Sequence, residues 1–489
     1  MAGMRLTGLA SGLDTENIVK ALSQANQVKI DNVKKKQTIT EWKKEAWTAL
    51  NTKLYNFYKD SLDMFKSIST YNAKAVSGSY SGVKITATPN AASGVHKVKV
   101  NETAVAQMWT GDKIGESASA KLTDLGIADG TIITVNGKDI TVDTNTTLAN
   151  LASSMQGAGI NASYDAAQGR FYLSSKSAGL DNKFEITSSD PTALDKLGLD
   201  LAPGAAGRIE ARDASITYNG VVYEQSSNVF TINGLTITAE KEGDEQTFNV
   251  ELDTQGIYDK IKGFVKEYNA LIEEMQKLYS APSAKDYKPL TQEEKDAMSD
   301  DEIEKWEAKI KESVLRRDDT IGGLLSGMRT ILSKSVEVTG ADGTTSKFSL
   351  SSFGIVTGAY QEKGKLHING DSSDSDFAMA VDKLMAALSS NPDAVAKTFS
   401  AIGNELYSKL QEAMKRTDLS SALTFYNDKQ MDKEIGDYNK QIKSLQEKLE
   451  KEQDKYYKQF AAMETAMAKL QAQQTYLGQL FAGGMGMQQ

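Results

Sequence analysis

The feature that most constrains this chain is a long apolar stripe close to its C-terminus. Apolar residues recur there at alternating steps of four and three, which is the spacing of one helix face in a coiled coil. The stripe comprises Met431, Ile435, Tyr438, Ile442, Leu445 and Leu449 and then, after a step of 11 residues, Phe460, Met463, Met467, Leu470, Gln474, Leu477 and Phe481. The longer step is a stutter, at which we expect the supercoil to unwind locally. Because no proline interrupts residues 427–481, the pattern predicts one continuous helix of ~80 Å.

A second helical stretch opens the chain. Asp14 or Thr15 can cap it, and an apolar face follows. That face is strongest at Trp47, Leu50, Leu54 and Phe57. Lysines between residues 34 and 44 occupy the other faces, and we expect them to be solvated rather than to form a binding patch. Neither helix can bury its apolar face alone, so we predict that the two ends pack on each other or on neighbouring copies.

The middle of the chain has a different composition. From Tyr71 to about residue 253 it is rich in Ser, Thr, Val and Gly, and short alternating patterns predict β-strands. Asn-Gly pairs that begin at Asn136, Asn219 and Asn233 lie between such strands and predict tight type I′ hairpins. A short helix is expected after Thr146 or Thr147, either of which can cap it.

These patterns predict a multidomain α+β fold, with coiled-coil or helical legs from both termini and two β-rich domains inserted between them. We expect four domains: a helical leg from residues 1–40 and 430–489, a helical body with small β elements from 41–74 and 254–429, a β-rich domain from 75–107 and 208–253, and a distal β-rich domain from 108–207. In the body, helix is expected from Phe377 to Met414.

The sequence contains few of the cysteine and histidine side chains that often carry out catalysis. Cysteine is absent, and His96 and His367 are the only histidines, so neither a thiolate site nor a histidine-based metal site or relay is expected. Residues 358–365 (GAYQEKGK) have the wrong glycine spacing for a phosphate loop. Asp371, Asp374 and Asp376 lack the spacing of a calcium loop, and we expect them to cap the helix at Phe377. We therefore predict no catalytic residue, cofactor or metal.

Charge and hydropathy exclude two further classes of partner. The net charge of −9 and the even spread of lysines argue against nucleic acid, which requires a concentrated positive surface. No apolar run approaches the ~20 residues that a membrane helix requires. The first 13 residues lack the layout of a cleaved signal peptide.

Several long segments resemble the flagellar filament cap protein family, also called hook-associated protein 2. The similar segments are residues 8–36 (GLASGLDTENIVKALSQANQVKIDNVKKK), 215–275, 287–325 and 460–477 (FAAMETAMAKLQAQQTYL). Residues 122–186 resemble the insertion motif that this family shares with flagellins. Residues 364–377 (GKLHINGDSSDSDF) depart from the family pattern, because an Asn-Gly pair and a serine-rich insert stand where helix usually follows.

The resemblance implies a secreted structural protein rather than an enzyme. It implies a ring of copies, a homopentamer by the family pattern, at the distal tip of the flagellar filament, where exported flagellin folds and polymerises. Export through the flagellar channel, with the help of an export chaperone, would require no cleaved signal peptide. An alternative is a tip adhesin whose β-rich domains bind host glycan, mucin or another surface ligand. A cell-wall hydrolase is a third class, which would require a carboxylate pair in a cleft.

Overall fold

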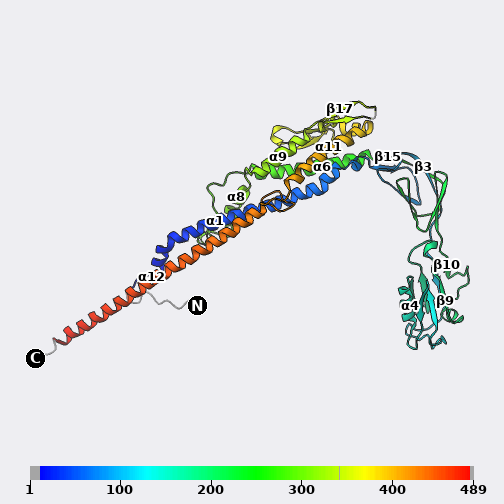
Figure 1. Cartoon of the computed structure of the whole chain (residues 1–489), viewed down its shortest axis with the longest axis horizontal. Helices are drawn as coiled ribbons and strands as arrows, with labels where there is room; N and C mark the ends of the chain where they lie inside the picture. Colours follow the sequence, from blue (N-terminus) through cyan, green and yellow to red (C-terminus); the bar gives the residue numbers. More distant parts are fainter. Residues whose placement is uncertain (1–11, 341, 485–489) are drawn as a thin grey trace. The chain divides into compact units, whose positions relative to one another are not determined.

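The computed structural model describes residues 12–340 and 342–484 of the chain. These residues form two compact units. The chain passes from the first unit to the second after Ser67 and returns to the first after Ile257. One unit contains both ends of the described chain and is mainly helical, and the other is the inserted segment between the two crossings and is mainly β (Figure 1). The predicted combination of terminal helices and inserted β-rich segments is therefore confirmed.

Two long helices dominate the helical unit. α1 (Thr15–Asn56) begins at Asp14, whose carboxylate accepts a hydrogen bond from the main-chain N–H of Asn17 at 3.1 Å. α12 (Asp428–Gly484) has 57 residues, which corresponds to about 85 Å of helix. The two helices lie side by side, with the start of α1 far along α12 (Figure 1). The predicted cap and the predicted continuous C-terminal helix are both present.

Shorter elements complete the helical unit. Its other helices are the π-helix η1 (Phe57–Leu62), α2 (Asp63–Lys66), most of α6 (Thr254–Tyr279), α7 (Gln292–Asp296), α8 (Asp300–Ser313), α9 (Asp319–Leu332), the 3₁₀ turns η3 (Leu350–Phe353) and η4 (Tyr360–Glu362), α10 (Lys383–Ser390) and α11 (Pro392–Ala413). Two small hairpins pair β16 (Val336–Thr339) with β17 (Thr345–Phe348) and β18 (Ile355–Thr357) with β19 (Leu366–Ile368). At the centre, the ring of Phe65 stacks on Phe264 at 3.7 Å and meets Phe399 at 5.5 Å. Burial of one such ring contributes about 1.5–3 kcal/mol.

The expected helix start at Phe377 is wrong. The chain forms turns there, and α10 begins only at Lys383, after Asp382 has accepted the main-chain N–H of Met385 at 2.9 Å. The physical reason is that the Asp371 carboxylate accepts hydrogen bonds from Lys262 at 2.6 Å and from the main-chain N–H of Ser373 at 2.9 Å, so it holds a local turn instead of a helix end. Pro392 then starts a separate helix, α11, because proline suits a first helical turn but not a helix interior.

The β unit contains two hydrophobic cores. The first lies under a five-stranded sheet with the order β1-β15-β3-β11-β12 and a three-stranded sheet with the order β13-β14-β2. Its elements are the short helix α3 (Ile68–Tyr71) and the strands β1 (Lys74–Ser77), β2 (Val83–Ala87), β3 (Gly94–Glu102), β11 (Ala214–Tyr218), β12 (Val221–Gln225), β13 (Val229–Ile232), β14 (Leu235–Ala239) and β15 (Gln246–Leu252). Alternation along these strands places one face inward, as in Leu235 and Ile237 of β14.

The second core lies between residues 108 and 209. Its sheets have the orders β10-β4-β8-β7 and β6-β5-β9. Its elements are β4 (Met108–Thr110), β5 (Ile132–Val135), β6 (Lys138–Thr141), α4 (Leu148–Gly157), β7 (Asn161–Asp165), β8 (Arg170–Ser174), η2 (Leu180–Asn182), β9 (Ile186–Ser188), α5 (Ala193–Lys196) and β10 (Arg208–Ile209). Thr147 caps α4 by accepting the main-chain N–H of Asn150 at 3.2 Å, which confirms one of the two predicted caps.

The three Asn-Gly turns form as predicted. Asn136, Asn219 and Asn233 have φ values of 51°, 48° and 50°, and each following glycine is also left-handed. These turns close the hairpins β5–β6, β11–β12 and β13–β14. Asparagine and glycine tolerate this backbone region, which is why the pair selects the turn.

Candidate assembly surface

Polar side chains fix the register between α1 and α12. The Gln37 side-chain amide donates to Oδ1 of Asn439 at 3.0 Å, and Lys44, nearer the other end of α1, pairs with Asp432. In the opposite direction, Asn26 donates to Glu452. The hydrogen bond with Asp432 raises the pKa of Lys44 above its ordinary 10.5. These contacts define an antiparallel pair, in which residue numbers rise on one helix as they fall on the other.

A small apolar layer lies between the polar contacts. Ile30 and Val33 of α1 are buried against Ile442 of α12. Three further residues of the predicted stripe, Tyr438, Leu445 and Leu449, are half-buried against this layer. Each exposed ion pair between α1 and α12 contributes only about 0–1 kcal/mol to their contact. The apolar layer therefore contributes more to holding the two helices together, although it contains few residues.

The four predicted residues of the N-terminal helix are covered by the helical unit itself. Trp47, Leu50, Leu54 and Phe57 are all buried. The indole ring of Trp47 stacks on Tyr426 with ring centroids 5.4 Å apart, and Phe57 meets Phe264 at 5.6 Å. These side chains therefore contact the same chain, and they offer little surface to a neighbouring copy.

The later residues of the stripe differ in exposure. Phe460, Met463 and Met467 are half-buried, whereas Leu470 is 59% exposed and Leu477 is 51% exposed. The antiparallel register brings the start of α1 close to the level of Phe460, so α12 continues beyond it. The side chain of Phe481 lies outside the described residues.

Ile435 has a separate environment from the rest of the stripe. It is half-buried at a shallow groove between α1 and α12, which is also lined by Thr48, Ala49 and Thr52. The groove is open on one side, so Ile435 keeps part of its side chain in contact with solvent.

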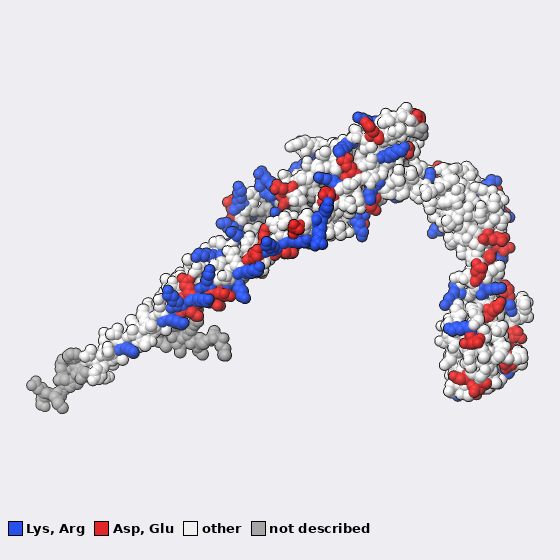
Figure 2. All heavy atoms as spheres, viewed as in Figure 1, with Lys and Arg blue, Asp and Glu red and all other residues white. Residues whose placement is uncertain are grey.

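Charge is sparse along the last part of α12. Lys469 is the last charged residue of the sequence. In Figure 2 this end of the helix is almost free of charged side chains, while basic and acidic side chains alternate over the rest of the helical unit. An uncharged helix end with exposed leucines is typical of a surface that another helix covers.

The sequence did not predict the acidic partners of the lysines between residues 34 and 44. Lys35 pairs with Glu294 at 3.0 Å, and Lys43 pairs with Asp318 at 3.1 Å, so these two lysines are not simply solvated as expected. The Lys311 ammonium also lies 4.9 Å from the ring centroid of Trp42. The signal that was available is the acidic character of the connector at residues 291–302, which contains two capping boxes.

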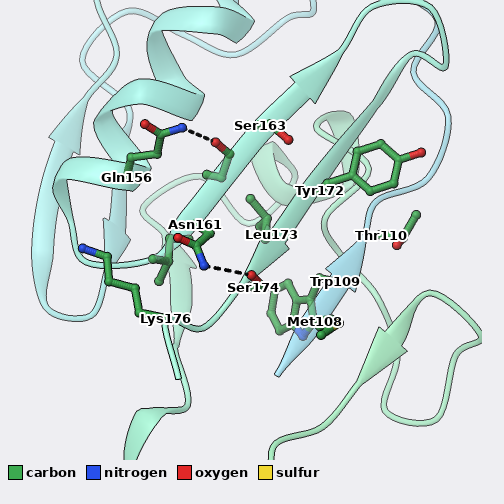
Figure 3. A pocket seen from close by; sticks show the side chains of 12 residues that line it. Met108, Trp109, Thr110, Gln156, Asn161, Ser163, Tyr172, Leu173, Ser174 and Lys176 are labelled. Atoms are coloured by element: carbon green, nitrogen blue, oxygen red, sulfur yellow. Dashed lines mark hydrogen bonds between the residues drawn. The ribbon is translucent and has the colours of Figure 1, made fainter. Parts of the chain in front are cut away.

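The β unit carries an open groove of its own. The groove has a volume of about 780 Å³ and lies on the outer face of β4, β8 and β7. Tyr172, 40% exposed, projects from the middle strand between Thr110 and Ser163, which pair with it across the sheet (Figure 3). Asn161 donates to Ser174 at 3.2 Å beside it. An accessible aromatic ring among hydroxyl and amide groups can bind a polar ligand that also has an apolar face.

Both histidines have structural neighbours. His96 is buried, and its ring nitrogens lie 2.8 Å from the Tyr218 hydroxyl and 3.0 Å from the carbonyl oxygen of Ala92. The His367 ring stacks on Phe377 at 4.3 Å, with a carboxylate oxygen of Asp374 at 2.5 Å from Nδ1. Within residues 12–340 and 342–484, no three His, Asp or Glu side chains are grouped so as to hold a metal ion.

The helices of the described residues are not of the membrane-spanning kind. None of their helices combines the length and the apolar character that crossing a bilayer requires.

Comparison with known proteins identifies the family. The profile of the flagellar hook-associated protein 2 C-terminus matches residues 211–472, and the profile of the N-terminus of the same protein matches residues 11–107. Flagellar hook-associated protein 2 of Halalkalibacterium halodurans is 28% identical, over 98% of this chain and 100% of that protein. Its counterpart in Escherichia coli K12 is 24% identical, over 98% of each.

A solved structure is also similar. The crystal structure of the D1-D2-D3 domains of the flagellar cap protein FliD from Escherichia coli aligns with a TM-score of 0.49 at 21% identity, and covers 75% of this chain and 96% of that one. The two family matches, which together take in most of the sequence, lead to one assignment. The chain belongs to the flagellar hook-associated protein 2 family and is a flagellar cap protein of the filament tip, a structural protein and not an enzyme.

Proposed function

We propose that copies of this chain form a ring, a homopentamer, that sits on the distal end of the filament and promotes the folding and polymerisation of exported flagellin. The observation that carries this proposal is the exposed apolar end of α12, where Leu470 and Leu477 lie in contact with solvent. Full burial of a leucine side chain is worth about 1.5–3 kcal/mol, so a partner that covers both residues gains a substantial free energy. Neighbouring copies and the filament tip are the partners that a cap protein meets.

The stripe residues have separate roles in this proposal. Leu445 and Leu449 hold α12 against α1 and so build the leg. Phe460, Met463, Met467, Leu470 and Leu477 meet neighbouring molecules. We also propose the four-domain division given above, with legs at residues 1–40 and 430–489 that contact the filament, and with β-rich domains that cover the site where flagellin folds.

Secretion completes the proposal. The chain reaches the tip by export through the flagellar channel, kept unfolded with the help of an export chaperone. The absence of cysteine supports this route, because a chain that is threaded unfolded gains nothing from disulfide bonds.

The proposal is tested by electron microscopy of purified protein with filaments. Wild-type protein should form rings and attach to filament ends. The double variant Leu470→Asp with Leu477→Asp should lose attachment, because each charge would have to be desolvated at the contact. Ala472→Asp with Gln479→Asp places two charges on the opposite face of the same helix and should attach normally. Equal attachment by both double variants, or a wild-type protein that ignores filament ends, would refute the proposal.

The exposed groove around Tyr172 favours a second function, in which the tip also acts as an adhesin for glycan or mucin. Hydroxyl and amide side chains beside an open aromatic ring match the alternating polar and apolar surfaces of a sugar. Immobilised mucin should bind the full-length wild-type chain and should bind Tyr172→Ala much more weakly. Tyr360→Ala removes another exposed tyrosine, on the helical unit, and serves as the control. Unchanged mucin binding by Tyr172→Ala would remove this second function.

A further inference from the structure

One edge strand of the five-stranded sheet has no neighbouring strand on its outer side among the described residues. β12 is the last strand of that sheet and pairs only with β11. Sheet edges of this kind are normally blunted by proline, lysine, a bulge or a covering segment, because they offer unpaired main-chain groups to any extended chain. The sequence of β12 is VVYEQ, which contains neither proline nor lysine, and its pairing with β11 runs without a register shift.

Main-chain groups on the outer side of β12 lack partners among the described residues. The Asn-Gly turn makes Tyr218 and Val221 the closing pair of the hairpin, which is the pair that exchanges both hydrogen bonds. Such pairs alternate along an antiparallel ladder. The N–H and C=O groups of Val222 and Glu224 therefore point away from β11, and they form no hydrogen bond with any residue in the described part of the chain.

The side chains of this edge are also uncovered. Val221 is 55% exposed and Val222 is 56% exposed, and they point to opposite faces of the strand. The end of β13 shows how this chain blunts another edge, because the carbonyl oxygen of Val229 there accepts from the side chains of both Gln225 and Ser227. β12 has no comparable cap at its outward groups.

We propose that β12 is a docking edge for an extended, unfolded segment of the exported flagellin chain, which adds to the sheet as an antiparallel or parallel sixth strand. This inference rests on the proposed function. Main-chain pairing is almost independent of sequence, which suits a protein that meets a chain before it folds. The incoming strand would place an apolar side chain beside Val222 and a basic or hydroxyl side chain beside Glu224, the one charged residue of β12.

A second copy of the same strand fits less well. When two β12 strands pair through their outward groups about Tyr223, Glu224 of each strand faces Val222 of the other. When they pair about Glu224 instead, two like charges face each other, which is destabilising. When they pair about Val222, Glu224 of each strand faces Gly220 of the other, which lies in the turn, so little of the ladder can form. A segment from a different chain avoids all three mismatches.

The test uses the full-length protein and short synthetic peptides that tile flagellin. Binding of some of these peptides should slow amide exchange at Val222 and Glu224. Val222→Pro removes only an outward N–H, and an edge strand tolerates proline at such a position. Val222→Lys places a charged side chain at the edge, which opposes pairing with another strand. Each variant should weaken peptide binding by about tenfold, because the proline removes one main-chain hydrogen bond to the added strand and the lysine places a charge at the edge where that strand would lie. Val95→Lys adds the same charge to a 70% exposed position of β3 and should bind as wild type does.

Two results would overturn the inference. One is peptide binding that is equal in the wild type and in both Val222 variants. The other is protection of the two amides that appears without peptide and grows with protein concentration, which would make a second copy the occupant. Attachment of the same variants to filament ends is counted separately and should be normal. A wild-type protein that fails to attach refutes the proposed capping function, whereas the peptide experiment decides the role of β12.

Discussion

The indole N–H of Trp47 donates a hydrogen bond to the carboxylate of Asp318 at 3.3 Å, across 271 residues of sequence. The same carboxylate receives the ammonium group of Lys43 at 3.1 Å and accepts the main-chain N–H of Thr320 at 3.0 Å. One side chain thus caps α9 and ties it to α1 at the point where α1 enters the helical core.

Asp318→Ala should therefore destabilise the helical unit. Loss of a cap costs about 0.5–2 kcal/mol, and loss of the Trp47 hydrogen bond about 1 kcal/mol more, so the free energy of unfolding should fall by roughly 1.5–3 kcal/mol. Chemical denaturation measures this change. Asp318→Asn keeps a capping oxygen and should lose less. A fall below 0.5 kcal/mol for the alanine variant (about the lower limit for a cap) would show that the carboxylate has no structural role.

The apolar layer between the terminal helices is the next target. Leu445→Asp with Leu449→Asp should separate α12 from α1, because burying a charge there costs about 2 kcal/mol or more per site. Filament capping should be lost while the β unit keeps its fold, which amide hydrogen exchange over residues 68–257 can follow. Ser444→Asp with Lys451→Asp alters exposed positions of the same helix and is the matched control. Normal capping by the leucine variant would contradict the proposed leg.

The terminal helices should order on docking. The layer that joins α1 to α12 is small, and the end of α12 exposes Leu470 and Leu477. Residues 427–481 should therefore exchange their amide hydrogens rapidly in the free monomer and slowly on filament ends, since local stability follows the apolar contacts that a segment makes. Hydrogen exchange followed by mass spectrometry measures both states. Strong protection of these residues in the free monomer would oppose this expectation.

Acid should loosen the connector from α1. The hydrogen bond from the Thr291 main-chain N–H, together with Lys35, lowers the pKa of Glu294 below its ordinary 4.5. The contribution of a carboxylate with a lowered pKa is fully present above the unfolded value and is lost as pH falls through the folded value. The stability of the helical unit should thus decline below about pH 4.5.

Glu294→Gln should flatten part of that acid transition. Glu302 is the appropriate comparison, because the Ser299 main-chain N–H lowers its pKa in the same way, in a capping box that has no partner lysine on α1 among the ion pairs of the described residues. Glu302→Gln should keep its cap, because the glutamine carbonyl oxygen can also accept the Ser299 main-chain N–H, and it should not change the salt dependence. If high salt weakens both variants and the wild type equally, then the Lys35 pair does not contribute.

Much of the architecture follows from periodicity alone. The step pattern of α12, the absence of proline in it and the capping residue Asp14 are local properties, and local properties define helices and their ends. The three Asn-Gly turns are equally local, because only a few residues tolerate a left-handed backbone.

The partner of an apolar face is not a local property. Trp47, Leu50 and Leu54 have the spacing of a coiled-coil face, but the same spacing serves a helix that enters a globular core, and here they are buried beside Tyr426 and the rest of the helical unit. Lys35 and Glu294 are separated by 259 residues, so no pattern along the chain could pair them. The missed turn at Phe377 has a similar cause, since it depends on Lys262 reaching Asp371.

The chain leaves the helical unit after Ser67 and re-enters it at Tyr258. In the sequence, both crossings lie between the end of α1 and the start of α12. The contacts that hold α1 to α12 all come from residues outside the inserted segment. Substitutions, insertions or even replacement of strands between the crossings leave those contacts untouched. A protein built in this way can vary its inserted segment while the pairing of its two terminal helices stays the same.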